Sequence, residues 1–154
     1  MLDFSKKTPI IFEYKMCHIK SVNGQLEEVY RPLAIIKVGK KNFSMTALID
    51  TGSDKTISYL DPFGKQLGVD IDDYEGEPPS ELRGLNGISK AWPKHMDVWI
   101  GDHYFNLNIF WITDEYNIEK EYNMILGRNL IFNHFDVVFV ESEKKVYFYA
   151  KDNR

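Results

Sequence analysis

The stretch of residues 47–56, ALIDTGSDKT, decides how the rest of the chain is interpreted. Its apolar start ends on the carboxylate of Asp50, and a hydroxyl residue and a glycine follow directly. Such an apolar run predicts a buried strand, so a carboxylate at its end needs hydrogen-bond donors or a nearby positive charge. Gly52 allows the backbone to turn back tightly beneath it. Two interpretations follow: a turn at the end of a strand, which is common, or a carboxylate held in place for chemistry.

The chain has 154 residues, which is the usual size of one domain and enough to bury a core without disulfides. Hydrophobic residues make up 44% of it and aromatic residues 14%, which indicates a globular rather than a disordered protein. The many Phe, Tyr and β-branched residues favour strands over helices. We therefore expect a single domain over residues 1–154.

Charge and cysteine content predict a soluble, cytoplasmic protein. The formal net charge of −4 shows no strong block, which argues against nucleic acid as a partner. The single cysteine, Cys17, excludes an internal disulfide and fits a reducing compartment. The start of the chain lacks the apolar core of a signal peptide, and no apolar run approaches the roughly 20 residues that cross a bilayer. No membrane partner is therefore expected.

Turn signals divide the chain into short strand-like segments. Asn23-Gly24 is a strong hairpin signal, and Gly101-Asp102 separates two further apolar segments. Strands are expected over residues 10–19, 32–38, 43–50, 95–100, 103–112, 124–126, 136–140 and 145–149. Two weak helical segments, residues 61–68 and 128–135, lie between them. The pattern predicts an all-β fold, either a small barrel or a sandwich.

A second motif, ILGRNLI over residues 125–131, resembles the first in its order of segments. A short apolar strand is followed by a glycine and then by a short helix. Here Arg128 follows Gly127 directly. By ordinary residue usage, an Asp-Thr-Gly or Asp-Ser-Gly triplet occurs by chance in roughly one chain in ten of this length. The triplet alone therefore leaves both interpretations open, and the second motif favours the chemical one.

Together, LIDTGSDKT and ILGRNLI resemble the two signature motifs of the retroviral-type (retropepsin-like) aspartic proteases. The resemblance runs from about Pro32 to Tyr149 and leaves residues 1–30 as an N-terminal extension without an assigned role. It implies an all-β fold: a closed small β-barrel of the retropepsin (acid protease) type, with one short C-terminal helix and one lobe per chain. Terminal strands help form the family's dimer sheet. Residues 145–154 are expected to do so here, with the extension replacing or covering that contact.

The resemblance implies an aspartic endopeptidase in which two aspartates face one water molecule. One ionised carboxylate takes a proton from the water, and the protonated one hydrogen-bonds to the peptide carbonyl. Two carboxylates so close cannot both ionise, so they share a proton. This chain contains one Asp-Thr-Gly and no Asp-Ser-Gly. Two copies of Asp50 are therefore expected to meet across the two-fold axis of a homodimer, which is also the family's arrangement.

Other residues take roles from their positions in the family's motifs. Thr51 is expected to hydrogen-bond across the dimer, and the backbone of Gly52 to contact the peptide. Arg128, directly after Gly127, is expected to support the loop by pairing with Asp54. A buried pair would hold the loop against the helix, whereas the alternative is a surface ion pair worth about 0–1 kcal/mol.

Substrate contacts are expected from the loop and from a hairpin. The expected contact residues are Gly52, Ser53 and Asp54 in the loop, and Leu85, Asn86 and Gly87 in the hairpin. The hairpin RGLNGIS resembles the family's flap, which closes over the peptide; the alternative is an ordinary hairpin between barrel strands. The Ser53 hydroxyl is expected either to donate to Asp50, extending activity to more acid pH, or to bond its own local backbone.

No metal and no cofactor are expected, because the four histidines show no metal-ligand spacing. Two functions other than a protease remain open. One is a catalytically silent retropepsin-like module that dimerises or binds a peptide, and the other is a structural β-barrel whose Asp-Thr-Gly is only a turn.

Overall fold

The computed structural model describes residues 3–84, 87–129 and 131–152, and its ten strands form one continuous sheet. The strands are β1 (Ile10–Lys20), β2 (Leu26–Val38), β3 (Phe43–Ile49), β4 (Thr56–Tyr59), β5 (Ser80–Gly84), β6 (Gly87–Ile100), β7 (His103–Ile112), β8 (Met124–Leu126), β9 (Phe135–Val140) and β10 (Lys145–Ala150). Helix α1 covers Ile131–His134, and short helical turns lie at Leu60–Gly64, Ile71–Tyr74 and Glu141–Glu143. The predicted all-β fold is confirmed.

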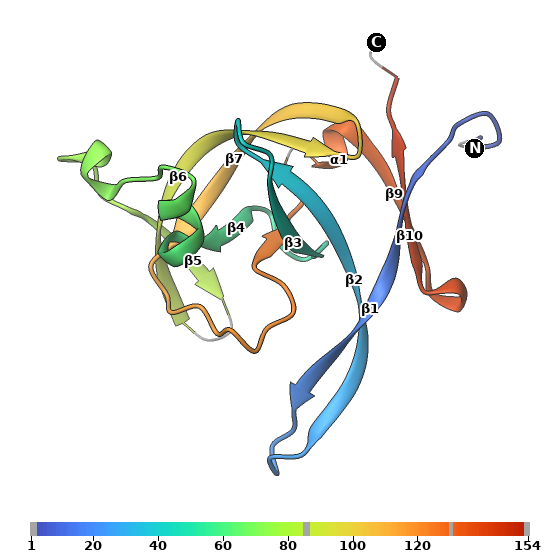
Figure 1. The fold of residues 1–154 in the computed structure, drawn as a ribbon, viewed down its shortest axis with the longest axis horizontal. Coiled ribbons are helices and arrows are strands. Elements are labelled where there is room, and N and C mark those ends of the chain that lie inside the picture. The colour runs from blue at the N-terminus through green and yellow to red at the C-terminus, as the bar shows by residue number, and fades with distance from the viewer. Residues whose placement is uncertain (1–2, 85–86, 130, 153–154) are drawn as a thin grey trace.

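Backbone pairings link six of these strands in a closed ring. Strand β2 pairs with β3, and the ring continues through β8, β4, β7 and β6. Strand β6 then returns to β2 where Lys37 pairs with Trp99 and Val38 with Val98. Figure 1 shows the curved strands β6 and β7 running from the left over the top of the molecule, whereas β9 and β10 extend along its right side. The ring provides the enclosed interior that the expected small barrel requires.

Apolar side chains fill this interior, because alternate residues of a strand point to opposite faces. On β2, Ala34 and Ile36 are fully buried, while Ile35 between them is 55% exposed. The largest fully buried side chains include Trp111, Phe135, Phe148, Ile36 and Met45. Since Phe135 begins β9 and Phe148 lies on β10, the two C-terminal strands complete the same core.

The predicted hairpins are confirmed. Strands β1 and β2 are antiparallel neighbours on either side of Asn23-Gly24, and β6 and β7 meet around Gly101-Asp102. Gly24 and Gly101 both have positive φ, the conformation that favours glycine in tight turns. Strands β5 and β6 form the hairpin expected near residue 85, with Gly84 opposite Gly87. Its predicted tip residues, Leu85 and Asn86, lie outside the described residues.

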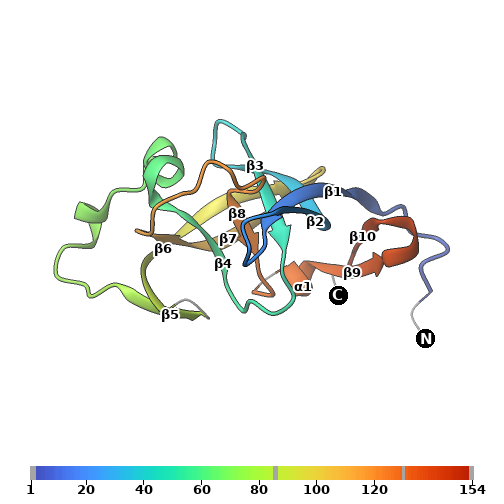
Figure 2. The same ribbon diagram turned by 90° about the horizontal axis from the view of Figure 1, so that it is seen from below.

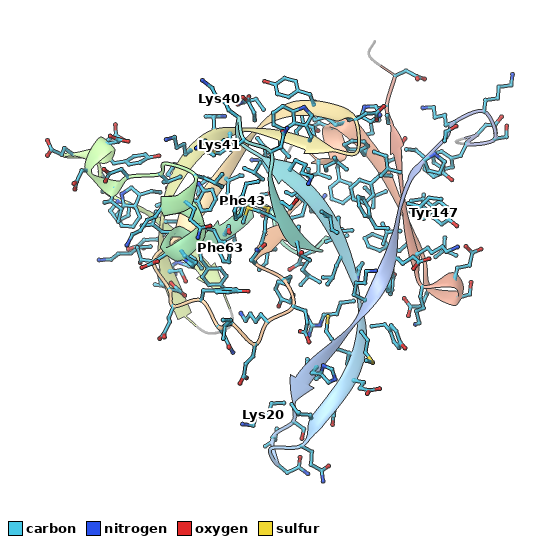
Figure 3. The ribbon with its side chains drawn as sticks, viewed as in Figure 1. Lys20, Lys40, Lys41, Phe43, Phe63 and Tyr147 are labelled. Carbon is cyan, nitrogen blue, oxygen red and sulfur yellow. The ribbon has the colours of Figure 1, made fainter. Side chains whose placement is uncertain are left out.

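The N-terminal segment is built into the sheet. Residues 10–13 pair with β10, and residues 14–20 pair with β2. Residues 14–32 thereby form a two-stranded β1–β2 arm, which extends from the body of the molecule and carries Lys20 near its end (Figures 1 and 3). Strand β10 lies between β1 and β9, so both of its edges are already paired within the chain. The N-terminal segment thus lies along the C-terminal strand within the chain, whereas the expected contribution of residues 145–154 to a dimer sheet stays a prediction.

The helix expected near the C-terminus is shorter than the sequence suggests. The helix expected over residues 128–135 is limited to α1, and Phe135 already starts β9. Residues 113–123 contain neither helix nor strand and run as a loop into β8. None of the helices in the described part of the chain is long and apolar enough to span a membrane.

Candidate active site

The two sequence motifs meet because β8 lies between β3 and β4. Strand β3 is parallel to β8, with Ile49 opposite Leu126, and β4 is antiparallel to β8, with Ile57 opposite Ile125. The chain therefore leaves β3, crosses the end of β8 in the loop of residues 50–55, and returns along the other side as β4. This crossing places the Asp-Thr-Gly loop against Gly127, although more than seventy residues separate them in sequence.

Backbone hydrogen bonds hold the loop on the end of β8. The amide of Asp50 donates to the carbonyl of Leu126 at 3.0 Å. In the other direction, the amide of Arg128 donates to the Ser53 carbonyl at 2.7 Å and the amide of Asn129 donates to the Asp54 carbonyl at 3.0 Å. These bonds satisfy the polar groups of a loop that turns sharply beside a core, and they fix the position of Asp50.

Gly127 makes this close approach possible. A Cβ atom at residue 127 would lie 2.2 Å from the carbonyl oxygen of Lys55 and 2.8 Å from that of Ser53. The Gly127 amide donates to the buried hydroxyl of Thr56 at 3.2 Å, which ties β8 to the start of β4. The expected supporting role of Gly127 therefore has a steric cause, since only glycine fits between the two segments.

The Asp50 carboxylate is half-buried at the mouth of the loop. Its Oδ1 accepts a hydrogen bond of 2.9 Å from the amide of Gly52, and a Cβ at residue 52 would approach the same oxygen to 3.2 Å. Thr51 and Gly52 are both exposed. The carboxylate is thus oriented by its own loop while it stays within reach of other molecules.

The Ser53 hydroxyl bonds to its local backbone, which is the second of the two expected arrangements. Its hydroxyl donates to the carbonyl of Lys55 at 2.8 Å, and so it closes the loop on itself. The expected donation to the Asp50 carboxylate is wrong for this conformation, because the bond to Lys55 uses the single hydroxyl proton. Ser53 therefore stabilises the turn.

The expected ion pair between Asp54 and Arg128 is not formed among the described residues of the single chain. Both side chains are exposed and line one surface pocket. The two segments are joined instead by the backbone bonds described above, which do not depend on the side chains. Water competes for exposed charges, so this surface offers little gain from an ion pair.

Sequence reasoning missed an apolar cluster beside the loop. Ala91, Phe110 and Ile112 are buried together on the face of the sheet away from the main core, and Ile57, Tyr59 and Leu82 pack against them. They come from β4, β7 and the β5–β6 hairpin. The cluster thus joins the strand that leaves the Asp50 loop to the hairpin expected as a flap. The antiparallel pairing of Ala91 with Ile112 and the parallel pairing of β4 with β7 bring these residues together.

A second missed feature supports the same strands. The buried hydroxyl of Ser58 donates to the carbonyl of Asn123 at 2.7 Å, and the Asn123 side chain accepts from the amide of Thr46 at 3.0 Å. Asn123 therefore bridges β3 and β4 at the entrance of β8. For metals, the described residues contain no group of three or more His, Cys, Asp or Glu side chains that could hold an ion.

Of the comparisons with known proteins, the one with solved structures agrees with the fold. No protein-family model matches the sequence, and no curated protein matches it either. Among solved structures, a retropepsin-like aspartic protease from Rickettsia conorii aligns over 94% of this chain and 96% of its own, with a TM-score of 0.59 and 16% identity. The chain has the retropepsin-like fold. The EIAV protease, solved with the inhibitor HBY-793, aligns over 67% of this chain and 86% of its own, with 16% identity and a TM-score of 0.49.

The retropepsin-like fold includes most of the N-terminal segment. Because the alignment with the Rickettsia protein covers 94% of the chain, it must extend well into residues 1–30. The sequence motifs alone had left this segment outside the resemblance. Its strand β1 instead pairs with two other strands of the sheet, so it is part of the folded unit.

Proposed function

We propose that this protein is an aspartic endopeptidase that works as a homodimer, with one Asp50 carboxylate from each chain. The observation that carries the proposal is the Asp50–Gly52 turn, held on the end of β8 by main-chain bonds on both sides. The turn fixes the half-buried carboxylate where other molecules can reach it. The retropepsin-like fold of the chain is consistent with this activity, and fold alone does not establish it.

The chemistry follows from two carboxylates that share one proton. The ionised Asp50 removes a proton from a water molecule, whose oxygen attacks the carbonyl carbon of the peptide. The protonated Asp50 of the other chain hydrogen-bonds to the carbonyl oxygen as negative charge develops on it. Proton transfer to the leaving nitrogen then breaks the C–N bond. Because one proton must be present and one absent, the rate should fall on both sides of a pH optimum.

The homodimer is proposed because one chain supplies one such carboxylate. The sequence contains a single Asp-Thr-Gly triplet, so a two-aspartate site requires a second copy. The exposed Thr51 lies beside Asp50 and is available to hydrogen-bond to its counterpart in the other chain. Gly52 leaves room for an extended peptide backbone, and the β5–β6 hairpin with Gly87 would cover that peptide.

The proposal is tested by assaying the purified protein on a mixed peptide library beside the Asp50→Asn variant. We expect cleavage by the native protein, its inhibition by a pepstatin-type compound, and its loss in the variant. Circular dichroism and sedimentation of the variant provide the control for folding and association, because Asn keeps the size of the side chain.

The main competing function is a silent module that dimerises or binds peptides without cutting them. Tight peptide binding without cleavage over a broad pH range would favour that module. Cleavage that persists in Asp50→Asn would overturn the assigned mechanism, and full activity of a strictly monomeric protein would overturn the shared site.

A further inference from the structure

Lys55 occupies an unusual position between the Asp50 loop and the apolar cluster. Its ammonium nitrogen lies 4.5 Å from the centroid of the Phe110 ring, which is a cation–π contact. Phe110 is 8% exposed and belongs to the cluster with Ala91 and Leu82 of the β5–β6 hairpin. Through the charged end of Lys55, the Asp50 loop therefore contacts the apolar cluster.

The charge of Lys55 is not neutralised by a carboxylate. None of the ion pairs among the described residues includes Lys55 or Arg128. Both residues line a surface pocket of about 440 Å³ together with Asp54, Phe110, Asn129 and Asn133. The pocket thus contains two cationic side chains and one anionic side chain, so its net charge is positive while that of the whole chain is negative.

The pocket begins at the catalytic loop itself. Asp54 and Lys55 follow the Asp50-Thr51-Gly52 turn directly, and Arg128 is bonded through its backbone amide to Ser53. Amide groups of Asn129 and Asn133 add hydrogen-bond donors. A cationic pocket with neutral donors and an aromatic wall is suited to a carboxylate on a short aliphatic stem.

We propose that Lys55 selects peptide substrates that carry a glutamate or aspartate close to the scissile bond. This inference rests on the proposed endopeptidase function and adds the class of substrate. An extended peptide running between the Asp50 loop and the β5–β6 hairpin passes the Phe110 surface, where an acidic side chain reaches Lys55. A glutamine of the same size loses the ionic part of that contact.

The experiment starts from any peptide that the native protein cleaves in an Asp50-dependent way. Each position around the scissile bond is changed in turn to Glu and to Gln, and kcat/KM is measured for every pair. We expect one position at which Glu is preferred by about three- to tenfold, the range for a charge-assisted contact at a partly exposed site. In Lys55→Met, which keeps the aliphatic stem, this Glu to Gln ratio should fall to about one. In Lys55→Glu, a lysine at that position should become preferred.

Lys41→Met is the matched control, because it removes the same charge at a distance. Lys41 lies in the turn between β2 and β3, at the opposite end of β3 from Asp50 (Figure 3). In Lys41→Met, the ratio of kcat/KM for the Glu peptide to that for the Gln peptide should equal the ratio in the native protein. If Lys55→Met lost stability, binding would be measured instead of cleavage. The affinities of the same Glu and Gln peptides would be compared for the Asp50→Asn protein and for the Asp50→Asn protein that also carries Lys55→Arg. The arginine variant should keep the preference for Glu.

The outcomes separate this inference from the proposed function. Asp50-dependent cleavage with no preference for Glu at any position, or with a preference that Lys55→Met leaves intact, overturns the role of Lys55 alone. Absence of both cleavage and peptide binding in the native protein overturns the proposed function, and the selection of acidic peptides with it.

Discussion

Gly127 and Lys55 touch through their backbones, so that a Cβ atom on Gly127 would lie 2.2 Å from the Lys55 carbonyl oxygen. This contact joins the two sequence motifs. Real side chains do not tolerate such a distance, and the obstructing atom belongs to the main chain, which cannot rotate away. The position of the Asp50 loop therefore depends on the absence of a side chain at residue 127.

Replacing Gly127 with alanine should displace the loop from the end of β8. We expect a loss of about 3 kcal/mol in the free energy of unfolding, the upper part of the usual range for overpacking, and loss of most peptidase activity. Urea denaturation and a peptide assay measure the two effects. Gly84→Ala is the matched control, since no atom lies within 4 Å of a Cβ there, and it should change stability by less than about 0.5 kcal/mol. Equal behaviour of the two variants would contradict the steric argument.

The buried hydroxyl of Thr56 supports the same contact. Thr56→Val keeps the shape of the side chain and leaves the Gly127 amide without its acceptor. An unsatisfied buried donor costs about 1–3 kcal/mol, so the unfolding midpoint in urea should fall accordingly. The exposed Thr113 gives the control, because Thr113→Val removes a hydroxyl at the surface. A Thr56→Val protein as stable as the native one would show that this bond contributes nothing.

A shared active site has a distinct signature in mixed dimers. When native and Asp50→Asn chains are unfolded and refolded together in equal amounts, about a quarter of the dimers contain two native chains. Activity per total protein should therefore fall to about a quarter of that of the native protein. A value near one half would mean that each chain works independently. Mixing with the Lys41→Met variant, which retains Asp50 and changes a residue in the turn between β2 and β3, controls for losses during refolding.

The β1–β2 arm is attached to the loop of residues 113–123 through Glu121. Its carboxylate accepts a hydrogen bond of 3.0 Å from the His18 amide and lies 3.3 Å from the His18 ring nitrogen. The His18 backbone hydrogen bond, opposed by a smaller desolvation effect, lowers the pKa of Glu121 below its usual value of 4.5. A lowered pKa means that the contact stabilises the folded state above pH 4.5. This contribution is lost as the pH falls further and the folded carboxyl takes up its proton.

Thermal unfolding of Glu121→Gln tests this dependence. We expect the variant to be slightly less stable than the native protein at pH 7, by no more than about 1 kcal/mol because the site is partly exposed. The difference should disappear well below pH 4.5. Glu119→Gln, in the same loop but without a bond to His18, should show no such change. A difference between Glu121→Gln and the native protein that persists at low pH would mean that the carboxylate acts by packing.

Much of the fold was predictable because it depends on local sequence. The turns at Asn23-Gly24 and Gly101-Asp102 need glycines with positive φ, and these can be recognised from a few residues. The alternation of buried and exposed residues along β2 likewise follows from the two-residue period of a strand. The helix over residues 128–135 was overestimated, because Phe135 packs into the core and begins a strand.

Part of the site was also predictable, because it too depends on local sequence. The residue types of the Asp50 loop are visible in the sequence, whereas their partners are decided by the crossing over β8. The Ser53 hydroxyl was expected to donate either to the Asp50 carboxylate or to its local backbone. It donates to the Lys55 carbonyl, which lies within the same turn. The expected ion pair between Asp54 and Arg128 is not formed among the described residues, although both side chains line the same surface pocket. Their segments are joined by main-chain bonds, which the motif does not reveal.

The sequence by itself determined most of the strands, the turns and the residue types of the Asp50 loop, because each depends on residues close together in the chain. Strand β4 (Thr56–Tyr59) was not among the expected strands. Only the tertiary structure decided that Gly127 lies against Lys55, that β1 covers β10, and that Lys55 stands over Phe110. These contacts require the register of strands far apart in sequence and the closure of the ring between β2 and β6. Register and closure are properties of the whole core, because every strand must bury its apolar face at the same time.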